Sequence, residues 1–207
     1  MKNNQTIDKI QAIWNMVGGE EMVDALIQGR AKLEVKLIQI LNWLGTTTTS
    51  ATTEKFVAKE KFVKDSKEVK FYGILDNFTN WFLADDGKIE DPISEQMLRY
   101  GNLTTSSVDG LIIEELGGEA KAETTLSELY DLLKKQAKGE AGDLLTNGYA
   151  NIFYIKDTSS VLRAVFVFSR GDGWLVYAFS VGGSAGWRAG RRVFSPQFLK
   201  LGTLGSI

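Results

Sequence analysis

The 207-residue sequence contains no histidine and no cysteine, and these absences remove the commonest catalytic groups. Without histidine, the chain's own residues cannot form a Ser-His-Asp triad or a histidine-ligated zinc site. Without cysteine, there is no disulfide, no thiolate nucleophile and no thiolate metal ligand. Mg²⁺ or Ca²⁺ sites built on carboxylates stay open, although the acidic stretch 84–91 lacks EF-hand spacing. We therefore expect no cofactor, no metal site and no complete catalytic motif.

Long apolar runs are missing as well. No stretch of about 18 apolar residues occurs, so the sequence predicts no transmembrane helix and no membrane partner. The first residues, MKNNQTIDKIQAIW, have neither the apolar core nor the cleavage site of a secretory signal. The chain is 43% hydrophobic and 24% charged, which is typical of a globular protein. Together with the lack of cysteine, these features favour the cytoplasm.

The N-terminal part predicts a small helical module over residues 1–45. Apolar residues recur at helical spacing in two short stretches within residues 6–28. Residues 32–37 alternate like a strand, and the residues that follow them fit either a short helix or a strand. The Thr- and Ser-rich stretch 46–54 has no periodicity, which predicts a linker. We expect a second domain over residues 55–207.

This second domain mixes helices and strands before it ends in strands only. The expected elements of its first part are strands at 55–63, 68–74 and 96–101, and helices at 77–83, 110–116 and 126–138. Asp109 is expected to cap the helix that stops at Gly117. Thr125 and Glu128 have the capping-box spacing at the start of the clearest helix. This chain order predicts an α+β fold.

The C-terminal part, residues 148–195, predicts an antiparallel meander. Three aromatic-rich strands and a fourth are expected at 149–156, 161–170, 174–181 and 191–195. Both faces of the second and third strands are apolar, whereas a sheet with one wet face alternates with polar residues. We therefore expect the second face to be covered, either by the helices of residues 76–138 or by a partner.

Residues 182–186 read GGSAG after an expected strand, which fits the nucleophile-elbow pattern around Ser184. A serine nucleophile needs a base, and the chain has neither a histidine nor a Ser-x-x-Lys motif. The pattern also requires a helix directly after the turn, whereas residues 187–194 read as loop and strand. We interpret GGSAG as a hairpin loop. A phosphate-binding loop ranks low, because no Walker or dinucleotide motif is present.

Basic and acidic residues are distributed unequally along the chain. Residues 148–207 hold seven Lys or Arg against two acids, and the rest of the chain holds 17 against 24. Aromatic residues beside arginines on a sheet can stack on bases and hold phosphates. The same charges can instead neutralise the acidic body of the chain. The candidate binding residues are Trp187, Arg188, Arg191, Arg192, Arg163 and Trp174.

Three stretches of the sequence carry a family resemblance. They are IWNMVGGEEMVDALIQGRAKLEV near the N-terminus, NGYANIFYI, and the pattern W-x-x-G-x-R-V-F-S that begins at Trp187. Together they resemble an uncharacterised protein family of candidate-phylum and metagenomic bacteria, in which a helical module precedes varied C-terminal parts. The resemblance implies a bacterial, cytoplasmic protein and assigns no activity, cofactor or site residue.

A non-catalytic module that binds a protein partner or a second copy of itself fits these observations best. The alternative is a nucleic-acid-binding protein that uses the basic, aromatic C-terminal sheet, with an affinity that falls steeply with salt. A hydrolase that uses Ser184 or a carboxylate ranks below both.

Overall fold

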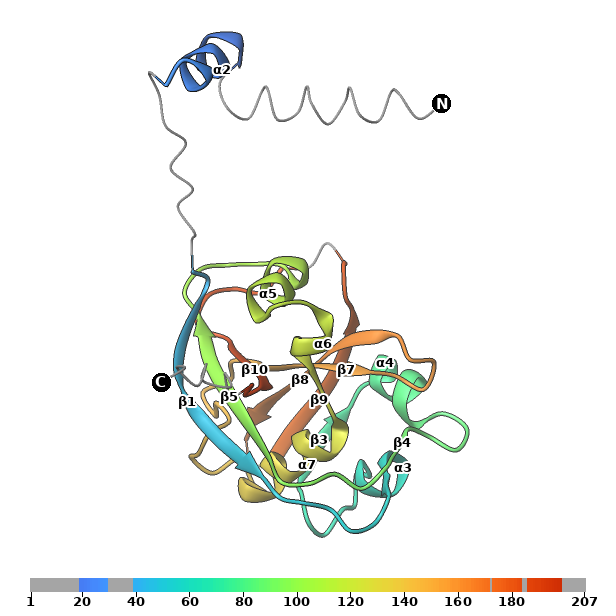
Figure 1. Ribbon diagram of the computed structural model, residues 1–207. Helices are drawn as coiled ribbons and strands as arrows, with labels where there is room; N and C mark the ends of the chain where they lie inside the picture. Colours follow the sequence, from blue (N-terminus) through green and yellow to red (C-terminus); the bar gives the residue numbers. More distant parts are fainter. Residues whose placement is uncertain (1–18, 30–38, 172, 184–185, 199–207) are drawn as a thin grey trace, which may run out of the picture. The chain divides into compact units, whose positions relative to one another are not determined.

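The computed structural model describes four stretches of the chain, residues 19–29, 39–171, 173–183 and 186–198 (Figure 1). The chain divides into two compact units, Met1–Ile38 and Gln39–Ile207. In the first unit, helix α2 (Gly19–Ile27) begins with two acidic residues, which interact favourably with the helix dipole. This helix agrees with the second of the two expected helices. The first helix and the alternating stretch 32–37 lie outside the described residues.

The described part of the second unit contains one large mixed sheet (Figure 1). Its strand order is β1-β5-β10-β7-β8-β9-β3, and the short β6 also pairs with β7. In chain order the bounds are β1 Leu41–Thr49, β3 Phe71–Ile74, β5 Gln96–Leu103, β6 Glu123–Thr124, β7 Asn151–Lys156, β8 Leu162–Arg170, β9 Gly173–Ser180 and β10 Arg192–Pro196. Helices and strands are therefore mixed, and the sheet predominates.

The expected meander is correct for three strands and wrong for the fourth. Strands β7, β8 and β9 pair antiparallel in chain order. Strand β10 does not follow β9 but lies between β5 and β7, antiparallel to β5 and parallel to β7. Strand β3 adds parallel to β9 at one edge. Local patterns show that a strand forms, but they do not show which strand it joins.

The first four residues of the threonine-rich stretch form a strand, so the linker expected at 46–54 is wrong over these residues. Its first four threonines belong to β1, which runs antiparallel to β5. Threonine is β-branched and favours extended backbone, and both Thr47 and Thr49 are buried. Four identical residues show no hydrophobic alternation, so the pattern concealed the strand. The boundary between the units falls after Ile38 instead of after residue 45.

Short helices and a two-stranded ribbon cover one face of the sheet, which we call the α7 face. They are α3 Ala58–Lys61, α4 Asp76–Phe78, the π-helical turn η1 Thr79–Leu83, α7 Leu126–Lys135, and the ribbon of β2 Phe56–Val57 with β4 Ile89–Glu90. Their apolar side chains form one buried cluster with Val165, Val167 and Trp174 from the sheet. Residues 55–63, expected as a strand, are mostly α3 and its flanks.

The start of α7 confirms the predicted capping box. The hydroxyl of Thr125 accepts from the backbone N–H of Glu128, and the Glu128 side chain accepts from the backbone N–H of Thr125. A second carboxylate, that of Glu90, accepts from the N–H groups of Leu126 and Ser127 at 2.9 Å each. These bonds satisfy N–H groups that a helix start leaves without an intrahelical partner.

Helices α5 (Asp109–Leu116) and α6 (Glu119–Ala122) pack on the opposite face, which we call the α5 face. Ile112 and Leu116 form a buried cluster there with Ile152 and Val193 from the sheet. Helix α5 ends at Gly117, whose φ of 98° allows the left-handed cap that the sequence predicts. Helices therefore pack on both faces of the sheet, and on the α5 face they leave part of β8 and β9 uncovered.

Candidate functional site

The chain crosses the α5 face of the sheet between β9 and β10. We call residues 181–191 the crossover, of which 184–185 lie outside the described residues. Trp187 and Ser107 exchange two backbone hydrogen bonds of 2.7 and 2.8 Å, and the N–H of Gly190 donates to the carbonyl of Leu103 at 2.7 Å. Strands β9 and β10 are separated by β8 and β7. The expected hairpin loop is therefore wrong.

The nucleophile-elbow hypothesis finds no support in this geometry. Ser184 itself lies outside the described residues. The elbow requires a strand, a sharp turn and then a helix. After Gly186, the crossover instead forms an isolated bridge and a turn and then enters β10.

The buried side chain of Trp187 fixes the crossover to the α5 face of the sheet. Its ring is buried, and its indole Nε1 donates to Asp109 Oδ1 at 2.7 Å. The hydroxyl of Tyr154, also buried, donates to the same oxygen at 2.9 Å. Burial raises the pKa of Asp109, and the two hydrogen bonds oppose this rise. Asp109, expected as a helix cap, is instead the first residue of α5 and holds the crossover in place.

Two of the predicted binding residues lie on the α7 face, whereas the crossover passes over the opposite, α5 face. Arg163, on β8, donates to Asp157 at 2.7 Å, and its guanidinium lies 4.0 Å from the ring centroid of Trp81. Trp174 is fully buried, and its indole donates to the backbone carbonyl of Gln136 at 2.7 Å. Trp174 is therefore a core residue that is not accessible to a ligand.

The three arginines near the crossover also separate. Arg192 donates to Asn102 Oδ1 at 3.0 Å and packs over the ring of Tyr100. Arg191 lies 5.8 Å from the ring centroid of Tyr149, and Arg188 is exposed. The six predicted residues therefore form no single patch.

A set of partly exposed aromatic rings lies on the α5 face beyond the cover of α5 and α6. We call it the aromatic face, and its members are Tyr72, Phe168, Tyr177 and Phe179. Tyr72 on the edge strand is 54% exposed and Phe179 is 39% exposed, while Phe168 and Tyr177 are half-buried. Sequence reasoning did not single out these residues as a surface.

The rings of the aromatic face stack on one another across β8 and β9. The ring centroids of Phe168 and Tyr177 are 5.5 Å apart, with an interplanar angle of 17°. The buried ring of Phe166 lies 5.0 Å from Tyr177 and 4.9 Å from Phe179. Trp187 of the crossover lies 6.2 Å from Phe179. The partly exposed rings therefore pack on the buried rings of Phe166 and Trp187.

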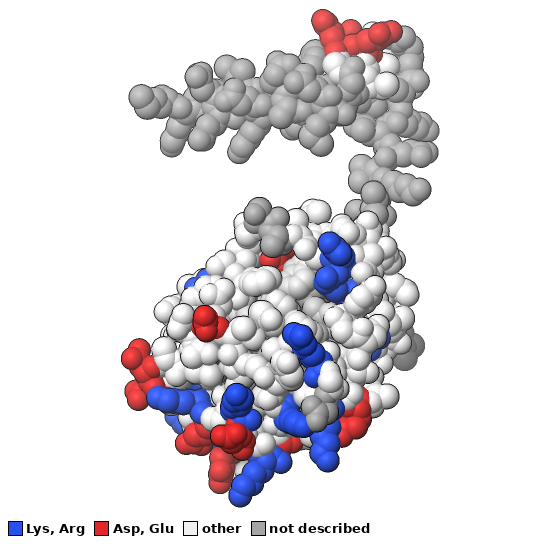
Figure 2. Space-filling view, turned by 180° about the vertical axis from the view of Figure 1, so that it is seen from behind, with Lys and Arg blue, Asp and Glu red and all other residues white. Residues whose placement is uncertain are grey.

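One arginine borders the aromatic face at the β3 edge. The guanidinium of Arg170 lies 5.2 Å from the ring centroid of Tyr72. Gly173, which pairs with Arg170, lies between them without a side chain, and an added Cβ would be 3.2 Å from the Tyr72 backbone nitrogen. Seen from behind, the large unit is mostly uncharged, and its acidic and basic side chains gather toward the lower end (Figure 2).

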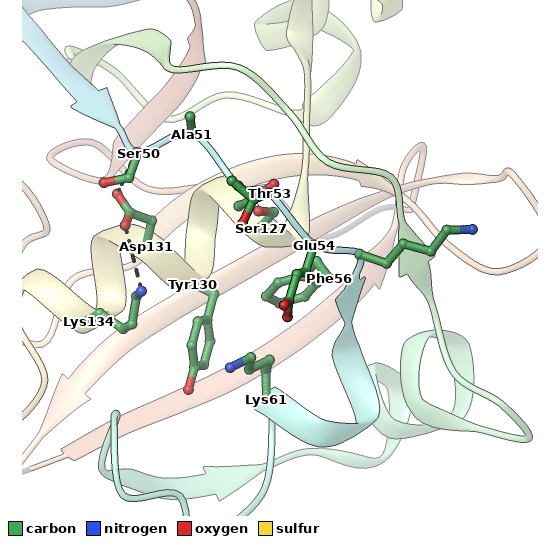
Figure 3. Close-up of a pocket in the computed structure, with 12 residues that line it drawn as sticks. Ser50, Ala51, Thr53, Glu54, Phe56, Lys61, Ser127, Tyr130, Asp131 and Lys134 are labelled. Carbon is green, nitrogen blue, oxygen red and sulfur yellow. Dashed lines mark hydrogen bonds and ion pairs between the residues drawn. The ribbon is translucent and has the colours of Figure 1, made fainter.

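A polar pocket of about 270 Å³ lies between residues 50–56 and helix α7 (Figure 3). Lys61, Lys134 and Asp131 contribute charge to its walls. These groups already pair within the chain, because Lys61 contacts Glu68 at 3.1 Å and Lys134 contacts Asp131 at 4.0 Å. The Asp131 carboxylate also accepts from the N–H of Ser50 at 3.0 Å. Glu54 and Lys55 also line the pocket, so its walls carry charges of both signs.

Comparison of the chain with protein-family models, with curated proteins and with solved structures finds no match. The resemblance to an uncharacterised bacterial family therefore gains no support from these comparisons. Over the described residues, each helix is too short or too polar to cross a bilayer.

Proposed function

We propose that the chain is a non-catalytic binding protein that holds a protein partner on the aromatic face. The observation that supports this function is the group of stacked, partly exposed rings on the α5 face, beyond the cover of α5, α6 and the crossover. Aromatic side chains contribute most to protein–protein binding, because they bury a large area and lose little conformational entropy. The buried rings beneath them add to this advantage, because rings that are already ordered lose less conformational entropy when a partner binds.

The charge around the aromatic face defines the chemistry of the partner. Arg170 borders one end, and Arg188 follows the Trp187 anchor at the other. The C-terminal part of the chain carries seven basic residues against two acidic ones. We infer a partner segment with exposed apolar side chains flanked by Asp or Glu, because complementary charge speeds association and fixes register.

The aromatic face fits a protein segment better than a nucleic acid. Nucleic-acid binding draws most of its affinity from several phosphate contacts made by Lys and Arg. Of the arginines predicted for this role, Arg163 pairs with Asp157 on the α7 face and Arg192 packs over Tyr100. On the face shown in Figure 2, uncharged residues separate several of the basic side chains, and others lie beside acidic ones.

Selection of displayed 12-residue peptides against the purified chain tests this proposal. We expect enrichment of peptides with apolar centres and acidic flanks. For a selected peptide, Phe179→Ser should raise the Kd by at least about tenfold, which is the loss of one well-packed interface ring. Ile89→Ser, at a similarly exposed residue on the β4 ribbon, is the matched control and should leave the Kd unchanged.

The same assay separates the competing functions. Unchanged melting temperatures for both variants would show that the effect concerns binding and not folding. If selected peptides bind Phe179→Ser as tightly as the parent, the aromatic face is not the binding surface. If a 12-nucleotide single strand binds instead, with an affinity that falls steeply with salt, the nucleic-acid alternative replaces this proposal.

A further inference from the structure

A shallow pocket of about 460 Å³ lies at the β1 edge of the sheet, at the opposite end of the strand order from the aromatic face. It forms where the β1–β5 register shifts between Trp43 and Gly45. The extra residue, Leu44, is 48% exposed. The pocket is lined by Trp43, Leu44, Gly45, Thr46, Arg99 and Gln197. Such bulges commonly redirect side chains toward binding sites.

Arg99 is held in one orientation on three sides. Its Nε donates to Ser195 Oγ at 3.0 Å, and its Nη2 donates to the carbonyl of Leu116 at 3.3 Å. Its guanidinium carbon lies 4.1 Å from the ring centroid of Trp43. A guanidinium that is already fixed loses little conformational entropy when it binds a ligand.

The positive charge of Arg99 has no paired carboxylate within the described residues. The neighbouring acid, Glu115, directs one carboxylate oxygen to the N–H of Ile40 at 2.7 Å and the other to the N–H of Leu41 at 3.0 Å. Burial lowers the pKa of Arg99 and Glu115 raises it, and arginine remains protonated at neutral pH. Among the described residues, Nη1 of Arg99 has no hydrogen-bond partner, so the N–H groups of this nitrogen are available to a ligand.

We propose that this pocket binds a carboxylate attached to an apolar group. The guanidinium fork matches the two oxygens of a carboxylate, while Thr46 and Gln197 place a hydroxyl and an amide beside it. Trp43 and Leu44 supply the apolar wall for the rest of the ligand. Arg99 is a single cation, and the negative charge of Glu115 offsets part of its positive potential. The pocket therefore suits a monoanion better than a phosphate dianion.

Two sources carry this chemistry, a free organic acid and the C-terminus of a peptide. Phenylacetate represents the first and N-acetyl-glycyl-phenylalanine the second, with their uncharged amides as controls. Titration of the ¹⁵N-labelled full chain by NMR follows the indole N–H of Trp43, which is assigned from the Trp43→Phe spectrum. We expect one or both acids to shift this signal at up to about 20 mM, above the millimolar Kd that one ion pair supports.

Variants decide whether Arg99 carries the binding. Arg99→Gln should weaken it at least tenfold, and Arg99→Lys should recover only part of the loss because lysine has no fork. Thr46→Val alters the rim without touching the Arg99 contacts and should weaken binding less. The control Arg188→Gln should leave the binding unchanged.

Binding of both acids supports the shared chemistry, and binding of one identifies its source. No shift with either acid, equal shifts with the amides, or unchanged binding in Arg99→Gln and Thr46→Val overturns the proposal.

Discussion

Replacement of Asp109 by alanine should loosen the crossover from the sheet. Asp109 Oδ1 accepts from Trp187 at 2.7 Å and from Tyr154 at 2.9 Å, and both donors are buried. Alanine leaves two buried donors without an acceptor, at about 1 to 3 kcal/mol each. The substitution also removes the desolvation penalty of the buried Asp109 carboxylate, which offsets part of this cost. We expect a net loss of about 3 kcal/mol in the free energy of unfolding at pH 7.

Replacement of Asp109 by asparagine separates the charge from the hydrogen bonds. The amide oxygen can still accept from both donors, so we expect a change within about 1 kcal/mol at pH 7. Burial raises the pKa of Asp109 in the folded chain. The folded state therefore keeps this proton at pH values where the unfolded chain has released it. The resulting stabilisation is complete below the unfolded pKa and is lost as the pH rises through the folded pKa.

Urea denaturation of the parent, Asp109→Ala and Asp109→Asn at several pH values measures both effects. The alanine variant should lower the midpoint by about 1.5 M, taking a slope near 2 kcal/mol per molar urea. The stability of the parent relative to the asparagine variant should fall as the pH rises above about 4, the ordinary pKa of an aspartate. A flat difference over this range, or an alanine variant as stable as the parent, refutes the assignment of Asp109 as a buried acceptor.

Two further substitutions test the supports of the fold. Glu90→Ala removes the acceptor of the N–H groups of Leu126 and Ser127, so it should cost about 2 to 4 kcal/mol; an unchanged melting curve by circular dichroism would contradict this. Burial acts to raise the pKa of Asp157, but backbone N–H groups and Arg163 donate to its carboxylate and hold the pKa below its ordinary value. Arg163→Met should therefore cost about 2 kcal/mol at pH 7 in urea denaturation, and the cost should shrink as acid protonates Asp157. A cost that does not shrink as the pH falls well below the ordinary pKa of an aspartate would point to lost packing.

Elements with strong local signals could be predicted from the sequence. Helix α7 has its apolar stripe, and the capping box of Thr125 and Glu128 marks its start. Strands β7, β8 and β9 are rich in aromatic and β-branched residues, and the turns between them are short. Elements whose identity depends on distant partners could not be predicted. Strand β10 is specified by contacts with β5 and β7, which lie tens of residues away in the sequence.

The predicted site failed because its residues were chosen for their charge and aromatic character, although alternation along the strands places them on different faces. Alternation along β8 places Arg163 with Val165 and Val167, on the face opposite to Phe166 and Phe168. This parity is visible in the sequence, and it separates the arginine from the aromatic rings. It also places Tyr177 and Phe179 on the same face of β9. The cross-strand register that stacks the rings is visible only in the structure.

Close packing explains two glycines of the crossover, Gly186 and Gly190, without any catalytic role. The crossover runs directly against the chain segments beneath it. A Cβ added at Gly186 would lie 3.2 Å from the carbonyl oxygen of Ser107. At Gly190, where φ is +84°, an added Cβ would lie 2.7 Å from the ring of Tyr149. Larger residues at these two positions would lift the crossover from the sheet and displace Trp187, which supports the aromatic face. Within the Gly-x-Ser-x-Gly pattern, close packing therefore explains Gly186, whereas the φ of +88° explains Gly182, where nothing lies within 4 Å of an added Cβ.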